Sequence, residues 1–341
     1  ADDSWDVEGE EIKLSNSINN ILTARIDRLS TLVKETVKAA AVIGREFELP
    51  ILSEVMQNQS STLFGQSENV PEDLRQQIQE AEQGQIWRAM NELRYIFKHS
   101  LLREAAYDMQ LRARLRKLHR LIAQAIEKLY GTNSEERYAD LAFHYEHAEE
   151  LEKAIEYLEK TADYFRNNYQ NEDALTYYDK LLKCIPKKET VERCKALMKK
   201  GGVHELVGEW EMAEDELLKA LDLARDSEDK LLIAQANNEL GELMLLQGNY
   251  EEARTHLNIS ATYAEMVADT EILMKVYGSL GDLYFRQGLY DDARTYFIKS
   301  LEMGERIDQL SSLAKTVANL GLTFMNQGKY EEGIRHMKQY L

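Results

Sequence analysis

The stretch LGDLYFRQGLYDDA, residues 280–293, decides the fold because the chain repeats it at an interval of 40 residues. Residues 240–253 read LGELMLLQGNYEEA, and residues 320–333 read LGLTFMNQGKYEEG. A weaker copy comes first, with glycines at Gly201 and Gly208. Chains with such periods stack helix pairs, because one pair alone cannot bury its apolar face. The second half of the chain is therefore predicted to be an all-α solenoid.

Each repeated residue has a physical role in such a helix pair. Gly281 lets the neighbouring helix approach closely, and Phe297 is expected to fill the layer between helices. Gly288 is expected to end the first helix in a left-handed conformation, which costs glycine little. Tyr290 then begins the second helix, and Asp269, in the joint between repeats, can cap the next helix start.

In order, the Leu-Gly step, the Gly-x-Tyr turn and the small residue after it resemble the tetratricopeptide repeat. The usual unit has about 34 residues, and the 40-residue units here are similar to those of Pins-type scaffolds, which hold extended peptides in a concave groove. The resemblance implies a right-handed superhelix. We expect regular repeats over residues 191–341, cut short in the last second helix at Leu341, after irregular helical hairpins over residues 111–190.

The resemblance also implies which side chains face the groove, since first helices usually point inward. Near each Leu-Gly step these are Asn238, Glu242, Asp282, Phe285, Arg286, Met325 and Asn326. The residues six before each glycine should lie on the same side, and they are Lys195, Gln235, Lys275 and Lys315. This mixture suits an extended peptide or protein segment. For any one of these residues, an ordinary solvated helix position is an equal alternative.

Composition narrows the class of protein. The 341 residues carry a formal net charge of -18, which argues against nonspecific nucleic-acid binding by the whole chain. We therefore do not expect specific DNA binding either. No apolar run approaches the roughly 18 residues of a membrane span, and no signal peptide is recognisable. Two cysteines, Cys184 and Cys194, cannot build a disulfide framework. We therefore expect a cytoplasmic protein without a membrane partner.

The first hundred residues follow another pattern. Helices are predicted over residues 17–29, 30–43, 50–56 and 72–93, extended pieces at 47–49 and 94–98, a polar loop over 57–71, and a further helix from His99. Three helices and a small hairpin suggest a winged-helix-like domain over residues 17–110.

Four phrases in this region resemble the part that follows the nucleotide-binding domain in bacterial signal-transduction ATPases of the STAND class. They are LTARIDRL (22–29), AAAVIGREF (39–47), FKHSLLREAAY (97–107) and RKLHRLIA (116–123). The resemblance implies an upstream ATPase domain in cis, with ATP or ADP as cofactor of the whole protein. Such ATPases are often joined to class III adenylate or guanylate cyclases or to protein kinases. Residues 1–16 are then expected to be a remnant of the ATPase domain.

The motifs of catalysis are missing from the sequence. It has no Gly-x-x-x-x-Gly-Lys-Ser/Thr phosphate loop, no His-Glu-x-x-His, no Gly-x-Ser-x-Gly and no cysteines at zinc spacing. We therefore predict no catalytic residue, no metal and no cofactor for this fragment.

Three groups of side chains have a functional and a structural interpretation. His99 resembles in placement the Met-His-Asp histidine that contacts ADP in STAND ATPases, although Lys98 and Ser100 depart from that motif; alternatively it bonds a backbone carbonyl at a helix start. His144 and His147 could share a metal or lie on a solvated face. A basic cluster could contact phosphate or DNA, or dock against the acidic surface of the repeats or of the ATPase; its members are Arg112, Arg114, Arg116, Lys117 and Arg120.

Three classes of function stay open at this point. The first is a regulatory, protein-binding arm of a larger ATPase, without catalysis of its own. The second is the sensor region of a transcriptional regulator, of the kind that winged helices and maltose-regulator-type activators use. The third is the regulatory region of a cyclase or kinase whose catalytic domain lies elsewhere.

Overall fold

The computed structural model describes residues 21–60, 72–307 and 313–340. The chain divides into two compact units, Ala1–Thr161 and Ala162–Leu341. Helix α8 (Leu151–Asn167) includes the point of division.

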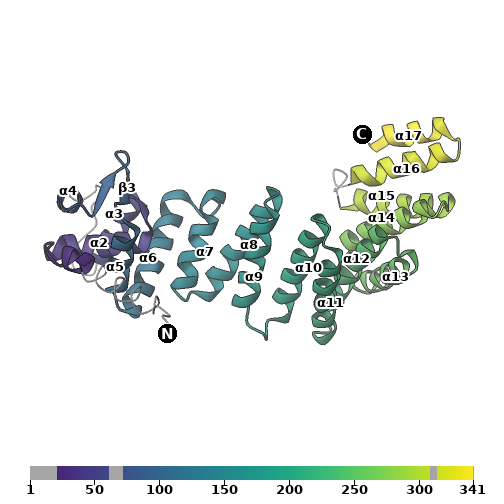
Figure 1. Cartoon of the computed structure of the whole chain (residues 1–341). Helices are drawn as coiled ribbons and strands as arrows, with labels where there is room; N and C mark the ends of the chain where they lie inside the picture. The colour runs from purple at the N-terminus through teal and green to yellow at the C-terminus, as the bar shows by residue number, and fades with distance from the viewer. Residues whose placement is uncertain (1–20, 61–71, 308–312, 341) are drawn as a thin grey trace, which may run out of the picture. The chain divides into compact units, whose positions relative to one another are not determined.

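The first unit joins a small mixed domain to longer helices (Figure 1). Residues 21–27 are helical, and the elements that follow are α2 (Thr31–Ile43), β1 (Glu46–Glu48), α3 (Leu49–Ser60), α4 (Glu72–Gln83), β2 (Trp87–Ala89), β3 (Arg94–Phe97), α5 (Ser100–Asp108), α6 (Arg112–Tyr130), the 3-10 turn η1 (Glu135–Arg137) and α7 (Tyr138–His147). The strands form an antiparallel sheet in the order β1-β3-β2. The fold is therefore all-α apart from this small sheet.

Local chemistry explains the start of this domain. The Ser30 side chain accepts a hydrogen bond from the backbone N–H of Val33 and caps α2, which ends before Gly44, as predicted. The sheet is held by packed aromatic rings, because Trp87 lies 5.0 Å from Phe47 and 5.6 Å from Phe97, measured between ring centroids. The Trp87 indole N–H donates to the carbonyl of Ile78, so even its polar edge is satisfied inside the core.

Two predicted boundaries in this domain are wrong. The helix predicted over residues 72–93 ends at Gln83, because the chain turns at Gly84 and Gln85, whose φ is 62°, and then enters β2. The loop predicted from residue 57 begins later, because α3 continues to Ser60. The rest of that loop, residues 61–71, lies outside the described residues, as do residues 1–16 of the predicted ATPase remnant.

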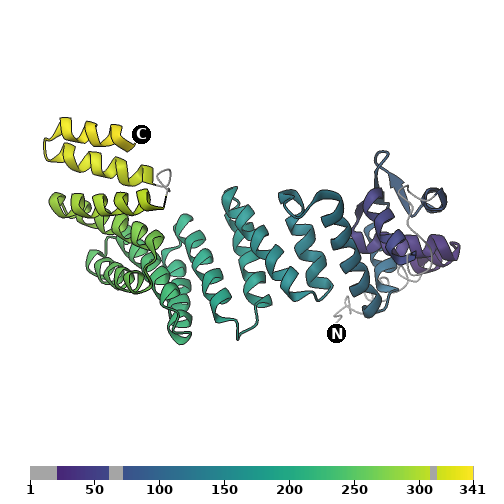
Figure 2. The same ribbon diagram turned by 180° about the vertical axis from the view of Figure 1, so that it is seen from behind.

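The second unit is a series of helix pairs, which both views display (Figures 1 and 2). After α8 come α9 (Asn171–Cys184), α10 (Thr190–Leu206), α11 (Trp210–Asp226), α12 (Lys230–Gln247), α13 (Tyr250–Val267), α14 (Thr270–Arg286), α15 (Tyr290–Arg306), α16 (Ala314–Asn326) and α17 (Tyr330–Tyr340). Each odd-numbered helix from α11 packs on the even-numbered helix before it, and the first helices α10, α12, α14 and α16 also contact one another in sequence.

The glycines of the repeats have the roles that the sequence predicts. A Cβ atom on Gly281 would lie 2.4 Å from Phe297, and one on Gly241 would lie 2.6 Å from Leu257. The two helices of each pair can therefore approach this closely only because the residue at the crossing is glycine. Gly288 has a φ of 76°, in the left-handed region, and the next helix begins at Tyr290.

The joints between repeats are capped by aspartates, also as predicted. One carboxylate oxygen of Asp229 accepts hydrogen bonds from the backbone N–H groups of Leu231 and Leu232, at 2.9 and 3.1 Å. Asp269 accepts from the N–H of Ile272 at 2.8 Å. Each cap satisfies donors that the first turn of a helix leaves without partners, so the chain can reverse direction between layers.

Candidate functional site

A cavity of about 360 Å³ opens on the first-helix side of the repeats. Its wall comes from α8, α10, α12 and the start of α14, and the residues are Arg166, Lys195, Met198, Lys199, Gly202, Gln235, Asn238, Glu239, Asp269, Glu271, Ile272 and Lys275. We call this the repeat cavity. It brings together four of the predicted groove residues, namely Lys195, Gln235, Asn238 and Lys275. They share this wall because each lies on a first helix. Lys195, Gln235 and Lys275 are spaced by 40 residues, and Asn238 follows Gln235 by three.

A second cavity, of about 140 Å³, contains two further predicted groove residues, Glu242 and Lys315, and shares Lys275 with the repeat cavity. Asp282 lies against Lys315 of this region and is 7% exposed. The other predicted groove residues are outside both cavities. Phe285 packs near Tyr290, Arg286 lies 3.9 Å from Asp282, and Met325 and Asn326 are exposed.

Neighbouring first helices are linked by a repeated polar contact that was not predicted from the sequence. Ser279 of α14 donates to Glu242 of α12 at 2.6 Å, and Asn319 of α16 donates to Asp282 of α14 at 3.2 Å. Both pairs join an acid to a residue 37 positions later, and the two pairs are 40 residues apart. That double periodicity was available in the sequence. The contacts fix the carboxylate of Glu242 in the second cavity and that of Asp282 beside Lys315.

Most cations of the repeat cavity already have carboxylate partners. Lys275 contacts Glu271 at 2.9 Å, and Lys199 contacts Asp163 at 2.7 Å. Glu239 is different, because it has no hydrogen bond or ion pair within the described parts of the chain. Burial, followed by repulsion from Glu242 and Glu205, raises the pKa of Glu239 to about 7. The cavity therefore contains a carboxyl group that has no ion-pair partner among the described residues.

His99 lies where the sequence places it, at the start of a helix. It is the N-cap residue of α5, its side chain is exposed, and the side chain makes no capping hydrogen bond. Its backbone carbonyl accepts from the N–H of Leu102 at 3.0 Å. The imidazole can therefore meet a group from outside this domain, and a nucleotide role for it stays a prediction.

The basic cluster of α6 is partly neutralised by acidic residues of the same unit. Arg116 contacts Glu149 at 2.8 Å. Arg114 and Arg120 form ion pairs with Glu35 and Glu150. Arg112 and Lys117 complete the cluster, and both are exposed. All three acidic partners belong to the first unit, so docking against the repeats or an ATPase domain stays a prediction, as does contact with phosphate.

A buried histidine cluster joins α6 to α7. The Nδ1 atoms of His119 and His144 lie 2.9 Å apart, so one ring donates its N–H to the other, and the Tyr107 hydroxyl lies 3.0 Å from His119 Nε2. Burial, with a smaller repulsion from His147, lowers the pKa of His119 to about 3, and burial also holds the pKa of His144 well below its usual range. His144 is thus a core residue, not a member of a solvated face. Across the described ranges, no group of three or more His, Cys, Asp or Glu side chains could hold a metal ion.

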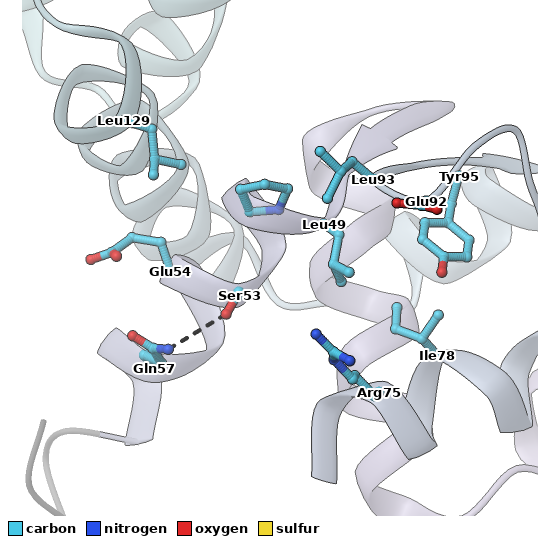
Figure 3. A pocket seen from close by; sticks show the side chains of 11 residues that line it. Leu49, Ser53, Glu54, Gln57, Arg75, Ile78, Glu92, Leu93, Tyr95 and Leu129 are labelled. Atoms are coloured by element: carbon cyan, nitrogen blue, oxygen red, sulfur yellow. Dashed lines mark hydrogen bonds between the residues drawn. The ribbon is translucent and has the colours of Figure 1, made fainter. Parts of the chain in front are cut away.

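The small domain has its own cavity, of about 610 Å³ (Figure 3). Residues of α3, α4, the hairpin and α6 line it, and Leu49, Ile78 and Tyr95 give it an apolar side. Gln57 donates to Ser53 on its α3 wall at 3.5 Å. No predicted site residue lies in this cavity.

No helix within the described residues is both long enough and apolar enough to cross a membrane.

Comparison with known proteins identifies the repeats. The profile of the tetratricopeptide repeat family matches residues 192–264 and 272–341. A curated relative, uncharacterized protein R02095 from Rhizobium meliloti (strain 1021), is 30% identical over 164 residues, which are 45% of this chain and 15% of the relative. The chain therefore spans a small part of the length of that relative.

Solved structures of similar fold are distant in sequence. BtubC from P. vanneervenii has a TM-score of 0.51 and 16% identity over 61% of this chain and 86% of its own. A Rap protein complexed with competence and sporulation factor has a TM-score of 0.50 and 17% identity over 71% of this chain and 69% of its own. A STAND protein with a tetratricopeptide repeat sensor, PH0952 from Pyrococcus horikoshii, has a TM-score of 0.46 and 15% identity over 92% of this chain and 57% of its own. The fold and the profile agree: residues 192–264 and 272–341 are tetratricopeptide repeats.

Proposed function

We propose that this chain is the non-catalytic, protein-interaction arm of a larger signal-transduction ATPase, and that its repeats hold a protein or peptide segment in their groove. The repeat cavity carries the proposal, because it gathers Lys195, Gln235, Asn238 and Lys275 from three successive first helices. A Rap protein of similar fold is solved in complex with competence and sporulation factor, which supports a ligand-holding use of such repeats.

The link to an ATPase rests on the first unit. Residues 22–29, 39–47 and 97–107 resemble STAND ATPases, and the order of elements from α2 to β3 is helix, strand, helix, helix, strand, strand. That order supports a winged-helix-like domain over residues 17–110, between an ATPase remnant (1–16) and the helical hairpins (111–190) that lead into the repeats (191–341). The exposed His99 would then face the ATP or ADP of an ATPase domain in cis.

Transcriptional control by direct DNA contact is the weaker proposal. In a winged helix, the last helix before the hairpin would enter the major groove, and here that helix is α4. It carries Glu72, Asp73, Glu80 and Glu82 but a single basic residue, Arg75. Such a helix would repel the phosphate backbone, so the acidic α4 favours a contact with protein.

The groove can be blocked at one position without disturbing the fold. Gly202 lines the repeat cavity, and a Cβ atom there would meet nothing within 4 Å. The variant Gly202→Trp should therefore fill the cavity. The probe is a fluorescent library of degenerate ten-residue peptides, measured by anisotropy against the whole chain. We expect binding by the wild type and a clear loss in Gly202→Trp.

The matched control is Asn258→Trp, which adds the same ring at an exposed position of α13, a second helix. It should bind the library as the wild type does. Equal binding by both variants would place the peptide elsewhere, and absence of binding by the wild type would refute the peptide-binding function.

A further inference from the structure

Three carboxylates act on one another beside the repeat cavity, and one of them, Glu239, lines it. Glu239 of α12 lines the cavity, and Glu242 of the same helix and Glu205 of α10 lie near enough to repel its charge. Of the three, only Glu242 has a described hydrogen bond, and its donors are neutral groups of Asn238 and Ser279. Lys275 and Arg166 of the cavity wall act on Glu239 in the opposite direction and lower its pKa, but less than burial and the two acids raise it.

Those two cations have closer partners of their own. Lys275 lies 2.9 Å from Glu271, and Arg166 lies 3.9 Å from Asp163. Lys315, in the neighbouring cavity, acts on Glu205 but lies 3.3 Å from Asp282. None of the three carboxylates has an ion pair within the described residues, although Lys195 and Lys199 also line the cavity.

The side chain of Asn238 indicates independently that the repeat cavity binds a hydrogen-bond donor. Its side chain is 3% exposed and lines the repeat cavity beside Glu239. The amide Nδ2 donates to Glu242 at 3.1 Å, which fixes the orientation of the amide, because the flipped form would put its oxygen against a carboxylate. The Oδ1 atom is left without a hydrogen-bond partner in the described structure. Buried acceptors are normally satisfied, so the site lacks a donor.

A donor with positive charge would satisfy all of these groups. It would donate to Asn238 Oδ1, offset the charge on Glu239 and reduce the repulsion among the three acids. An ammonium or guanidinium group has this chemistry and has no acceptor that would clash with the carboxylates. A carboxylate or phosphate would instead be repelled by Glu239, and its oxygens could not donate to Asn238 Oδ1.

We propose that Glu239, Glu242 and Asn238 form a subsite for a cationic nitrogen group, supplied by a lysine or arginine side chain of the peptide in the groove. The inference rests on the proposed peptide-binding function and specifies it. Burial and the neighbouring acids raise the pKa of Glu239 to about 7, which supports the assignment, since an occupying cation would bring it down.

The first experiment tests the subsite without a peptide. The probe is butylguanidinium, with uncharged butylurea of the same shape as reference. The side-chain carboxyl carbon of Glu239, labelled with ¹³C and assigned by its loss in Glu239→Gln, is followed by NMR in the whole chain. We expect a saturable shift and a lower titration midpoint with butylguanidinium, and neither with butylurea.

Matched variants separate the subsite from the general acidity of the chain. Measured by isothermal titration calorimetry, which needs no signal from residue 239, Glu239→Gln should weaken butylguanidinium binding roughly tenfold or more, as expected for loss of a charge-assisted hydrogen bond. Glu252→Gln removes the same charge from an exposed position of α13 and should leave binding unchanged. Equal binding of butylurea, or unchanged affinity in Glu239→Gln, would overturn the subsite.

The second experiment identifies the source of the cation. Two degenerate ten-residue peptide libraries differ at one central position, which is lysine in one and norleucine in the other. We expect the wild type to prefer the lysine library and Glu239→Gln to lose that preference. If both libraries bind equally, peptide binding stands and the lysine subsite is wrong. If butylguanidinium binds but neither library does, the peptide function fails and a free amine is the ligand.

Discussion

At Gly281 the distance between two helices depends on the absence of one carbon atom. A Cβ atom there would lie 2.4 Å from the ring of Phe297, which is 1% exposed and enclosed by its neighbours. Alanine would improve helix propensity by about 1 kcal/mol, but overpacking typically costs about 1–3 kcal/mol. We expect Gly281→Ala to lower the melting temperature, measured by circular dichroism.

The same substitution at Gly202 is the control, because it keeps the propensity gain and has no clash. A Cβ atom at Gly202 meets nothing within 4 Å. Gly202→Ala should therefore stabilise the chain by about 0.5–1 kcal/mol. If both variants shift the melting temperature in the same direction, the close approach at Gly281 does not control the helix crossing.

The histidine pair predicts a loss of stability in acid. Burial lowers the pKa of His119 to about 3, and it also lowers the pKa of His144. The unfolded chain, with histidine pKa near 6.5, therefore binds more protons below that pH than the folded chain. The free energy of unfolding should fall between about pH 6.5 and 3, by up to about 1.4 kcal/mol per pH unit for each histidine.

Hydrogen exchange localises this effect. Amides of α6 and α7 should lose protection from pH 7 to pH 5, after correction for intrinsic exchange rates, more than amides of α12. The variant His144→Leu should reduce that difference, whereas His99→Gln, at an exposed histidine of the same unit, should keep it. Equal pH dependence in α6 and α12 would show that the pair is not the acid-sensitive contact.

At the scale of elements, the repeats were predictable and the small domain only in part. Gly288, Tyr290 and Asp269 act locally, so each fixes a helix end within a few residues. The end of α4 depends instead on Trp87, which leaves the helical pattern to pack on Phe47 from a distant strand. A local pattern contains no information on that partner.

In the candidate site, too, the features that depend on the local repeat pattern were predictable, and those that depend on distant contacts were not. The periodic positions Lys195, Gln235 and Lys275 share one cavity because the period places them on successive first helices. The unpaired charge of Glu239 could not be predicted, since it results from which neighbours each lysine contacts. Lys275 contacts Glu271 in its own helix, whereas Lys315 contacts Asp282 of the preceding repeat.

A serine hydroxyl of the second helix forms a hydrogen bond with a backbone carbonyl of the first helix, and this contact recurs after 40 residues. Ser260 donates to the carbonyl of Ala234, and Ser300 donates to that of Met274, both at 2.7 Å and both fully buried. We expect Ser260→Ala to destabilise the chain by about 1 kcal/mol, measured by urea denaturation. Ser227→Ala, which removes a hydroxyl bonded within its own helix end, is the control. If the two variants lower the free energy of unfolding equally, the hydrogen bond between helices contributes no more than one within a helix end.

At the scale of the whole molecule, the excess of acidic residues determines which partners can approach. The formal net charge is -18, and the densest basic helix, α6, is partly neutralised by Glu35, Glu149 and Glu150. A cationic peptide would be attracted to this chain over a Debye length of about 8 Å at physiological salt. Nucleic acid would be repelled.

Duplex DNA should therefore bind weakly and without sequence preference. We expect a dissociation constant no tighter than the nonspecific range, on the order of 10⁻⁴ to 10⁻⁶ M at physiological salt, measured by fluorescence anisotropy. The double variant Glu149→Gln, Glu150→Gln releases Arg116 and Arg120 from their ion pairs and should bind DNA somewhat more tightly. Nanomolar, sequence-selective binding by the wild type would contradict the electrostatic argument, because phosphate contacts would then have to form against both the net charge and the acidic face of α4.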